Sequence, residues 1–152
     1  LDAVIVPVGG GGLIGGISRA VKLFSPECTV IGVEPVGADS LTRSINAGAP
    51  QVLERVDTIA DSLGAPRAMP MSYGVAAAHV DRMVLIEDDA MRDGMRLLFD
   101  AMKLIAEPAC AAALAALIGP LREELAGKSV GIIACGSNIS LERFSTLTQE
   151  LR

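Results

Sequence analysis

Four consecutive glycines, Gly9 to Gly12, stand between an apolar run at 3–8 and a helix-like stretch that opens at Leu13. A strand that ends in glycines and turns into a helix leaves main-chain N–H groups without partners, and the positive end of the helix dipole points to the same place. This arrangement suits a phosphate, and the missing side chains allow it to approach closely. A tight turn needs only one glycine, so four in a row favour a phosphate-binding loop.

Strand and helix signals alternate along the rest of the chain. Apolar runs predict strands at 4–8, 29–33, 83–86 and 129–134. Apolar periodicity and capping residues predict helices at 13–24, at 38–47, from Asp88 to about 106, from 108 to 118, and after Asn138. The stretch 49–72 is irregular and predicts a long surface excursion. The alternation predicts a single α/β domain over residues 1–152, with an open, mostly parallel sheet and helices on both faces.

The composition excludes several classes of function. Of the 152 residues, 51% are hydrophobic, which indicates either a dense α/β core or a face that is buried against something else. The net charge is −5 and the basic residues are scattered, so no nucleic-acid partner is expected. The longest uncharged stretch, 108–121, is too short to cross a membrane. Three cysteines without metal-ligand spacing indicate neither a disulfide framework nor a zinc site, and we expect a cytoplasmic protein.

Ligands of a parallel sheet bind beyond the carboxyl ends of its strands. The glycine tetrad, Glu34 and the segment 135–138 all follow predicted strands, so we expect them to meet at one site.

The same glycines also fit a second interpretation. Gly10, Gly12 and Gly15 have the spacing of the dinucleotide-binding fingerprint, and Glu34 lies where an acid would bind a ribose hydroxyl. Pro35 stiffens the chain beside that acid, and the tetrad is more open than a pyrophosphate turn requires. The local pattern leaves open a Rossmann-like dinucleotide-binding or regulatory module.

Ordered motifs over nearly the whole chain resemble the pyridoxal-phosphate enzymes that include threonine dehydratase, serine dehydratase and serine racemase. The resemblance lies in the segments 4–13, 31–35, 58–61, 102–108 and 134–138. It implies the tryptophan synthase beta-like fold, also called fold type II, in its large-domain portion. It also implies pyridoxal 5'-phosphate as cofactor, with the phosphate held by the main-chain N–H groups of Gly9, Gly10, Gly11, Gly12 and Leu13.

The resemblance assigns two side chains to the cofactor ring. Cys135 falls where the family places a serine or cysteine against the pyridine nitrogen, and Glu107 falls near the ring. A thiol, with an ordinary pKa of about 8.5, is a weak donor that leaves the nitrogen neutral, which favours rapid loss of a β-hydroxyl group. Considered without the resemblance, Cys135 is a small buried residue at a strand end, and Glu107, before Pro108, stabilises a helix N-terminus. Both interpretations stay open for each residue.

The resemblance further implies β-elimination from a small hydroxy amino acid, such as serine or threonine, to a 2-oxo acid and ammonia, in a homodimeric enzyme. In this family a lysine in a motif near the N-terminus of the whole chain forms a Schiff base with the cofactor. The lysines of this chain, Lys22, Lys103 and Lys128, lie in no such motif. We therefore expect the C-terminal portion of a dehydratase, without the Schiff-base lysine, with no catalytic residue of its own, and inactive alone.

Three positions depart from the pattern of the family. Relatives bind a divalent cation beside the Glu-Pro segment through two carboxylates and a main-chain carbonyl, but Ser40 stands in place of the second acid. Hard cations prefer carboxylate oxygens, so no metal site is predicted. Ser62 and Cys110 each replace a glycine common in relatives, and we expect both to crowd positions near the pocket.

Overall fold

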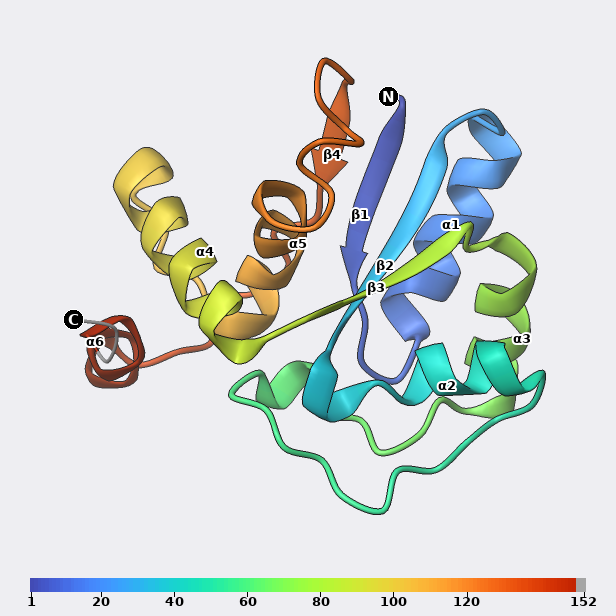
Figure 1. Ribbon diagram of the computed structural model, residues 1–152, viewed down its shortest axis with the longest axis horizontal. Helices are drawn as coiled ribbons and strands as arrows, with labels where there is room; N and C mark the ends of the chain where they lie inside the picture. Colours follow the sequence, from blue (N-terminus) through green and yellow to red (C-terminus); the bar gives the residue numbers. More distant parts are fainter. Residues whose placement is uncertain (150–152) are drawn as a thin grey trace.

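The computed structural model describes residues 1–149 (Figure 1). Its strands are β1 (Ala3–Pro7), β2 (Thr29–Pro35), β3 (Arg82–Ile86) and β4 (Val130–Ile132). They form one sheet in the order β3-β2-β1-β4, and every neighbouring pair is parallel. In this register, Ile5 lies opposite Ile31 on one side and Ile132 on the other. The predicted parallel sheet is confirmed.

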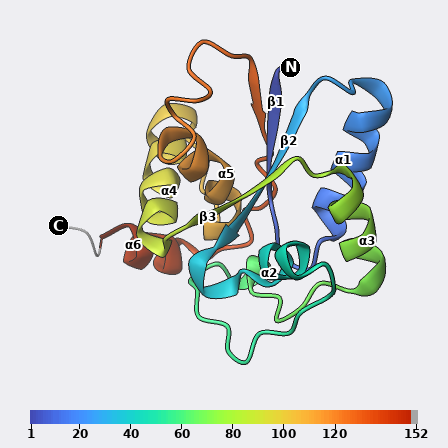
Figure 2. The same cartoon turned by 45° about the vertical axis from the view of Figure 1, so that its right-hand side comes forward.

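Helices cover the sheet from both sides (Figures 1 and 2). They are α1 (Gly12–Phe24), α2 (Ser40–Ala47), α3 (Pro70–His79), α4 (Asp88–Met102), α5 (Pro108–Ile118) and α6 (Leu141–Gln149), with short 3-10 helices η1 (Val36–Ala38) and η2 (Asp61–Leu63). α1 and α3 lie on one side, whereas α5 lies on the other with α4 packed against it. The predicted α/β class with helices on both faces is therefore confirmed.

Successive residues of β1 pack into different cores, because side chains alternate along a strand. Val4 and Val6 pack with Ile14 of α1, whereas Ile5 packs with alanines of α5 such as Ala112. α5 is buried along most of its length, as expected for a helix whose sequence is apolar all round. Its small side chains let the helix lie close to the strand that precedes the glycine tetrad.

α4 begins at Asp88 as predicted but ends at Met102 rather than near Ala106. Lys103 takes a left-handed conformation with φ of 57°, and its N–H donates to the Phe99 carbonyl at 2.9 Å. This turn closes the helix. The apolar spacing continues past it, so periodicity alone placed the end of the helix too late.

Two further segments differ from the prediction. The stretch 49–72 is neither wholly irregular nor wholly on the surface. α3 starts at Pro70. The side chains of Leu53 and Leu63 are only 7% and 4% exposed. The small residues of α3 give little periodic signal. β4 spans 130–132 rather than 129–134, and its residues are half-buried because it lies at an edge of the described sheet.

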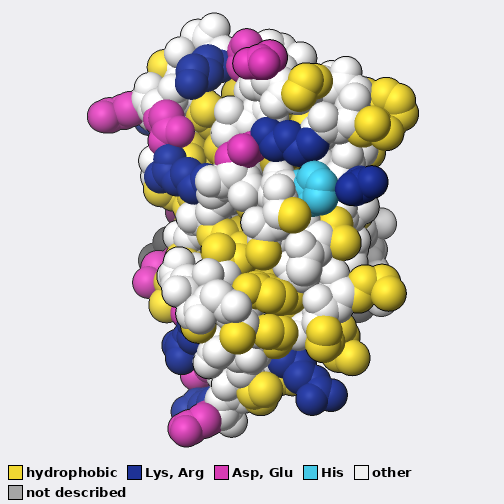
Figure 3. Space-filling view, turned by 90° about the vertical axis from the view of Figure 1, so that its right-hand side faces the viewer, with side chains coloured by type: hydrophobic (Ala, Val, Ile, Leu, Met, Phe, Trp, Pro, Cys, Tyr) yellow, Lys and Arg dark blue, Asp and Glu magenta, His cyan; other side chains and the backbone are white. Residues whose placement is uncertain are grey.

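The side of the molecule that α1 and α3 form carries exposed apolar side chains (Figure 3). Leu23 and Phe24 of α1 are 69% and 80% exposed, and Met71 of α3 is 83% exposed. Part of the high hydrophobic content therefore lies outside the core. No helix within residues 1–149 is both long enough and apolar enough to cross a bilayer.

Candidate functional site

The glycine loop, Gly9 to Leu13, joins the carboxyl end of β1 to α1. Just before it, the Val8 N–H donates to the Val33 carbonyl at 2.8 Å. Gly11 then turns the chain with φ of 85°, a conformation that L side chains rarely adopt. Within the described residues, the main-chain N–H groups of 9–14 donate to no protein acceptor. These donors at the N-terminus of α1 are open to an anion.

The four glycines serve two different purposes. A Cβ at Gly9 would lie 2.8 Å from the Ser62 carbonyl oxygen, and a Cβ at Gly11 would come within 2.9 Å of a side chain of α3. The protein's own packing restricts these two positions. At Gly12 a Cβ would meet no protein atom within 4 Å, and at Gly10 it would meet one only at 3.9 Å. Glycine at these two positions leaves space that the protein does not fill.

A pocket of about 380 Å³ opens at this loop. All the residues that the sequence predicted for cofactor binding line it: Gly9, Gly10, Gly11, Gly12, Leu13, Glu107 and Cys135. The loop after β1, the start of α5 and the loop after β4 bring them together. Leu63 and Ala109 also contribute to the wall. Their part was not predicted, since only the packing of η2 against Gly9 brings Leu63 there.

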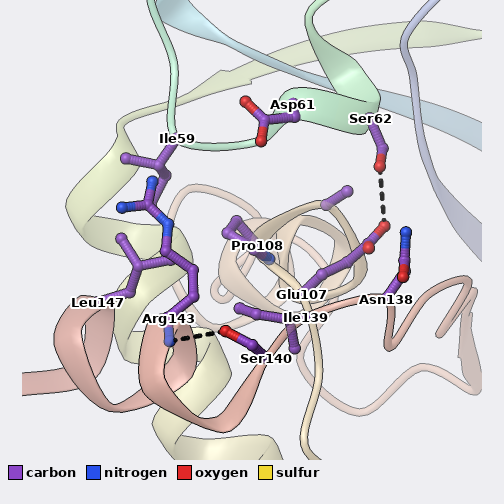
Figure 4. Close-up of a pocket in the computed structure, with 11 residues that line it drawn as sticks. Ile59, Asp61, Ser62, Glu107, Pro108, Asn138, Ile139, Ser140, Arg143 and Leu147 are labelled. Carbon is purple, nitrogen blue, oxygen red and sulfur yellow. Dashed lines mark hydrogen bonds between the residues drawn. The ribbon is translucent and has the colours of Figure 1, made fainter.

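Glu107 precedes Pro108 in extended backbone, with φ of −74° and ψ of 161°. Its side chain makes no capping hydrogen bond to α5. Instead, Ser62 Oγ donates to Glu107 Oε1 at 3.0 Å (Figure 4). The geometry therefore gives the carboxylate a place in the pocket wall rather than a bond to the helix that it precedes.

Cys135 follows β4 and is exposed, whereas Cys28 and Cys110 are buried. The interpretation of Cys135 as a small buried residue is therefore wrong. Desolvation of the sulfur raises the pKa of the Cys135 thiol, and the neighbouring Cys110 and Glu107 raise it further. The thiol stays protonated at neutral pH and offers the pocket a weak hydrogen-bond donor.

Ser62 and Cys110, the two residues that stand in place of glycines common in relatives, lie in different surroundings. Ser62 lines the pocket as expected. Cys110 does not: it is 2% exposed and packs between α4 and α5 with Met95 and Leu98. Cys110 therefore lies outside the wall of this pocket, but it lies near the pocket as expected, because it lines a neighbouring cavity together with Cys135.

Glu34 does not join this site. Its side chain is fully buried, and it faces the N-terminus of α2. The Leu41 N–H donates to Oε1 at 2.8 Å, while the N–H and hydroxyl of Thr42 donate to Oε2 at 2.8 and 2.6 Å. Burial raises the pKa of Glu34 to about 7, against the lowering effect of these bonds. The expected convergence was wrong for Glu34, and the dinucleotide interpretation loses its ribose-binding acid.

Ser40, in place of the second acid, does not complete a cation site. It is buried, and its Oγ has no hydrogen-bond partner within residues 1–149. In the same part of the chain, no three His, Cys, Asp or Glu side chains are grouped so that they could hold a metal ion.

A second pocket, of about 290 Å³, adjoins the first at Glu107 (Figure 4). Its lining mixes apolar and polar side chains, among them Ile59, Asp61, Pro108, Asn138, Ile139, Ser140, Arg143 and Leu147. Ser62, Glu107 and Ala109 line both pockets. These three residues therefore lie in the wall between the two cavities.

Comparisons with known proteins match nearly the whole chain. The family described as pyridoxal-phosphate dependent enzyme matches residues 1–136. Phenylserine dehydratase from Ralstonia pickettii is 54% identical over 145 residues, which cover 95% of this chain and 44% of that protein. L-threo-3-hydroxyaspartate ammonia-lyase from Saccharomyces cerevisiae is 35% identical over 148 residues, which cover 97% of this chain and 45% of that protein.

A solved structure shares the fold. The processed form of threonine deaminase isoform 2 from Solanum lycopersicum matches with a TM-score of 0.92 at 32% identity, over 97% of this chain and 43% of that one. The chain thus spans less than half the length of these relatives.

Proposed function

The chain belongs to the family of pyridoxal-phosphate dependent enzymes, and on this premise we propose that the complete protein is a hydroxy amino acid dehydratase. Such an enzyme eliminates the β-hydroxyl group and releases ammonia and a 2-oxo acid. The names of the relatives, which are dehydratases, deaminases and ammonia-lyases, support this reaction. Pyridoxal 5'-phosphate is the cofactor of the family.

The observation that carries the proposal is the set of unpaired N–H groups from Gly9 to Leu13. A phosphate bound there accepts main-chain hydrogen bonds at the positive end of α1. The open space at Gly10 and Gly12 supports a ligand that approaches the backbone closely. The residues present therefore fit the phosphate of the cofactor.

When bound, pyridoxal phosphate withdraws electrons from the α-carbon of an amino acid joined to it, which permits loss of the β-hydroxyl group. In our proposal Cys135 presents a neutral thiol to the pyridine nitrogen, and the raised pKa of this thiol supports that role. Glu107 borders the ring and orders the pocket around it. Its bond to Ser62 and its place in the pocket wall support this role.

The proposed substrates are small amino acids that carry a β-hydroxyl group. The relatives are named for phenylserine, hydroxyaspartate and threonine, so the group beyond the β-carbon differs among them. The 54% identity with phenylserine dehydratase makes 3-phenylserine the first compound to test, followed by threonine and serine.

We also propose that these residues form the C-terminal portion of the enzyme, and that the Schiff-base lysine comes from outside them. The 44% and 45% coverage of the relatives supports this division. The complete enzyme is then a homodimer in the cytoplasm. The free thiols of Cys28, Cys110 and Cys135 suit such a reducing compartment.

Two alanine substitutions in α1 test the phosphate cradle in the complete protein. Gly12 and Gly16 both lie in α1, and a Cβ at either would meet no protein atom within 4 Å, but only Gly12 lines the pocket. We expect Gly12→Ala to weaken pyridoxal phosphate binding at least about tenfold, and Gly16→Ala to leave it within about twofold. Titration followed by cofactor fluorescence measures both.

Turnover completes the test. The loaded wild-type protein should release ammonia and a 2-oxo acid from 3-phenylserine, threonine or serine. An equal loss of affinity in both alanine variants, or no product from any of the three compounds, contradicts the proposal. Micromolar binding of NAD that Gly12→Ala abolishes would favour the dinucleotide interpretation instead.

A further inference from the structure

Glu107 is held from two sides. Ser62, in η2, donates its hydroxyl to Glu107 Oε1 at 3.0 Å, and Figure 4 shows its side chain pointing at the carboxylate. On the other side, a Cβ at Gly136 would overlap that carboxylate, and the Gly136 carbonyl accepts the Glu107 N–H at 3.2 Å. The carboxylate therefore fills a slot between η2 and the loop after β4.

The backbone that carries Ser62 is itself well anchored. The Ser62 carbonyl packs against the Cα of Gly9, where a Cβ would come within 2.8 Å. Just before η2, Asp88 of α4 accepts hydrogen bonds from the Thr58 hydroxyl at 2.7 Å and from the Ile59 N–H at 2.9 Å. These contacts anchor the backbone from which the Ser62 side chain reaches Glu107.

We propose that Ser62 is a positioning residue, which holds the Glu107 carboxylate in the wall of the glycine-loop pocket beside Cys135. The resemblance to the family leads one to expect glycine at position 62. A glycine has no hydroxyl, so the carboxylate would lose this donor and turn more freely. The inference rests on the proposed function in one respect: the position of Glu107 affects catalysis only when the cofactor occupies the pocket.

The thiol of Cys135 reports the position of the carboxylate without any cofactor. The charge on Glu107 contributes to the raised pKa of this thiol. A carboxylate that turns away lowers that pKa and leaves more reactive thiolate. We expect Ser62→Ala to alkylate at Cys135 about twofold faster than wild type near pH 8, since 0.3 of a pKa unit is about twofold. Ser62→Thr, which keeps the hydroxyl, should react like wild type.

Alkylation of the cofactor-free complete protein by iodoacetamide, read by mass spectrometry at each cysteine, measures this rate. Glu107→Gln provides the matched background, in which Ser62→Ala should have no further effect because Ser62 acts through the carboxylate. Cys28 and Cys110, 3% and 2% exposed, react only if a variant unfolds, and Ser62→Gly replaces any variant that does.

An unchanged rate in folded Ser62→Ala or Ser62→Gly overturns the inference. An effect of the same size with and without the Glu107 carboxylate overturns it as well. Since the measurement uses no cofactor, its result is separate from failure of the proposed function, which would appear as absent pyridoxal phosphate binding in wild type.

Discussion

The helices α1 and α2 follow neighbouring strands of one sheet, yet their N-termini are satisfied in opposite ways. At α2, Glu34 from the end of β2 accepts hydrogen bonds from Leu41 and Thr42. At α1, the N–H groups of 9–14 have no protein acceptor within the described residues. A helix N-terminus attracts an anion in both cases. At α2 the acceptor is a carboxyl group of the chain itself, whereas the anion that we propose for α1 comes from outside.

The carboxylate of Glu34 at α2 is costly to ionise because it is buried. Burial raises the pKa of Glu34 to about 7, although its hydrogen bonds favour the ionised form. The phosphate that we propose for the glycine loop would instead bind in a pocket, and its binding would leave the core packing of the protein unchanged. We therefore expect substitutions at the N-terminus of α2 to lower the stability of the fold. Substitutions at the N-terminus of α1 should instead weaken the binding of pyridoxal phosphate.

Removal of the Glu34 carboxyl group should have the largest effect on stability. Glu34→Ala leaves the N–H groups of Leu41 and Thr42, and the Thr42 hydroxyl, without their acceptor. We expect the free energy of unfolding to fall by about 3–5 kcal/mol, measured by urea denaturation. The affinity of the folded variant for pyridoxal phosphate should stay unchanged. A loss below about 1 kcal/mol would mean that water replaces the carboxylate, and the contrast between the two helices would disappear.

The pH dependence of stability should be nearly as large. The pKa of Glu34 is about 7 in the folded protein and 4.5 ordinarily, so folding takes up a proton. The stability linked to this proton is complete below pH 4.5 and is lost as the pH rises through about 7. We expect a loss of about 3 kcal/mol between about pH 4.5 and about pH 8.

Glu34→Gln is the control for this titration, because an amide does not ionise. Denaturation curves at several pH values should show a flatter dependence in this variant than in wild type. Parallel pH profiles for the two proteins would assign the dependence to other groups.

A smaller effect should separate the two kinds of glycine in the loop. Gly11 has φ of 85° and a crowded Cβ position, so Gly11→Ala should reduce the free energy of unfolding by about 1–2 kcal/mol. Gly12→Ala, in open space, should leave stability within about 0.5 kcal/mol. Thermal and urea denaturation of the two variants measure the difference. Equal losses of stability in the two variants would contradict the distinction between Gly11, which the packing of the protein restricts, and Gly12, which faces open space.

The main features of the fold follow from signals that act locally. The run before Gly9 is apolar because β1 is buried on both faces, and the alternation of such runs with helices requires a parallel sheet. Asp88 marks the start of α4 because a carboxylate suits a helix N-terminus. The end of α4 was missed, because the left-handed turn at Lys103 leaves no mark on the apolar spacing.

The site was only partly predictable. The glycine tetrad by itself indicates a phosphate-binding loop, while Glu107 and Cys135 became candidates only through the resemblance of ordered motifs. The direction of the Glu34 side chain was not predictable. Its distance in sequence from the glycines suits an acid that binds a ribose hydroxyl, and only the position of α2 shows that the carboxylate points to the N-terminus of that helix. The bond from Ser62 to Glu107 joins positions 45 residues apart, and no local pattern reports such a contact.

The pairing of β1 with β4 has a consequence for how the protein is made. Ala3 lies opposite Val130, so one edge of β1 stays unpaired until the ribosome has synthesised nearly all of the described chain. Contacts between such distant positions form slowly, and an open strand edge invites association with other chains. Cys135 emerges later still, so the pocket acquires its last wall when translation of this region is almost over.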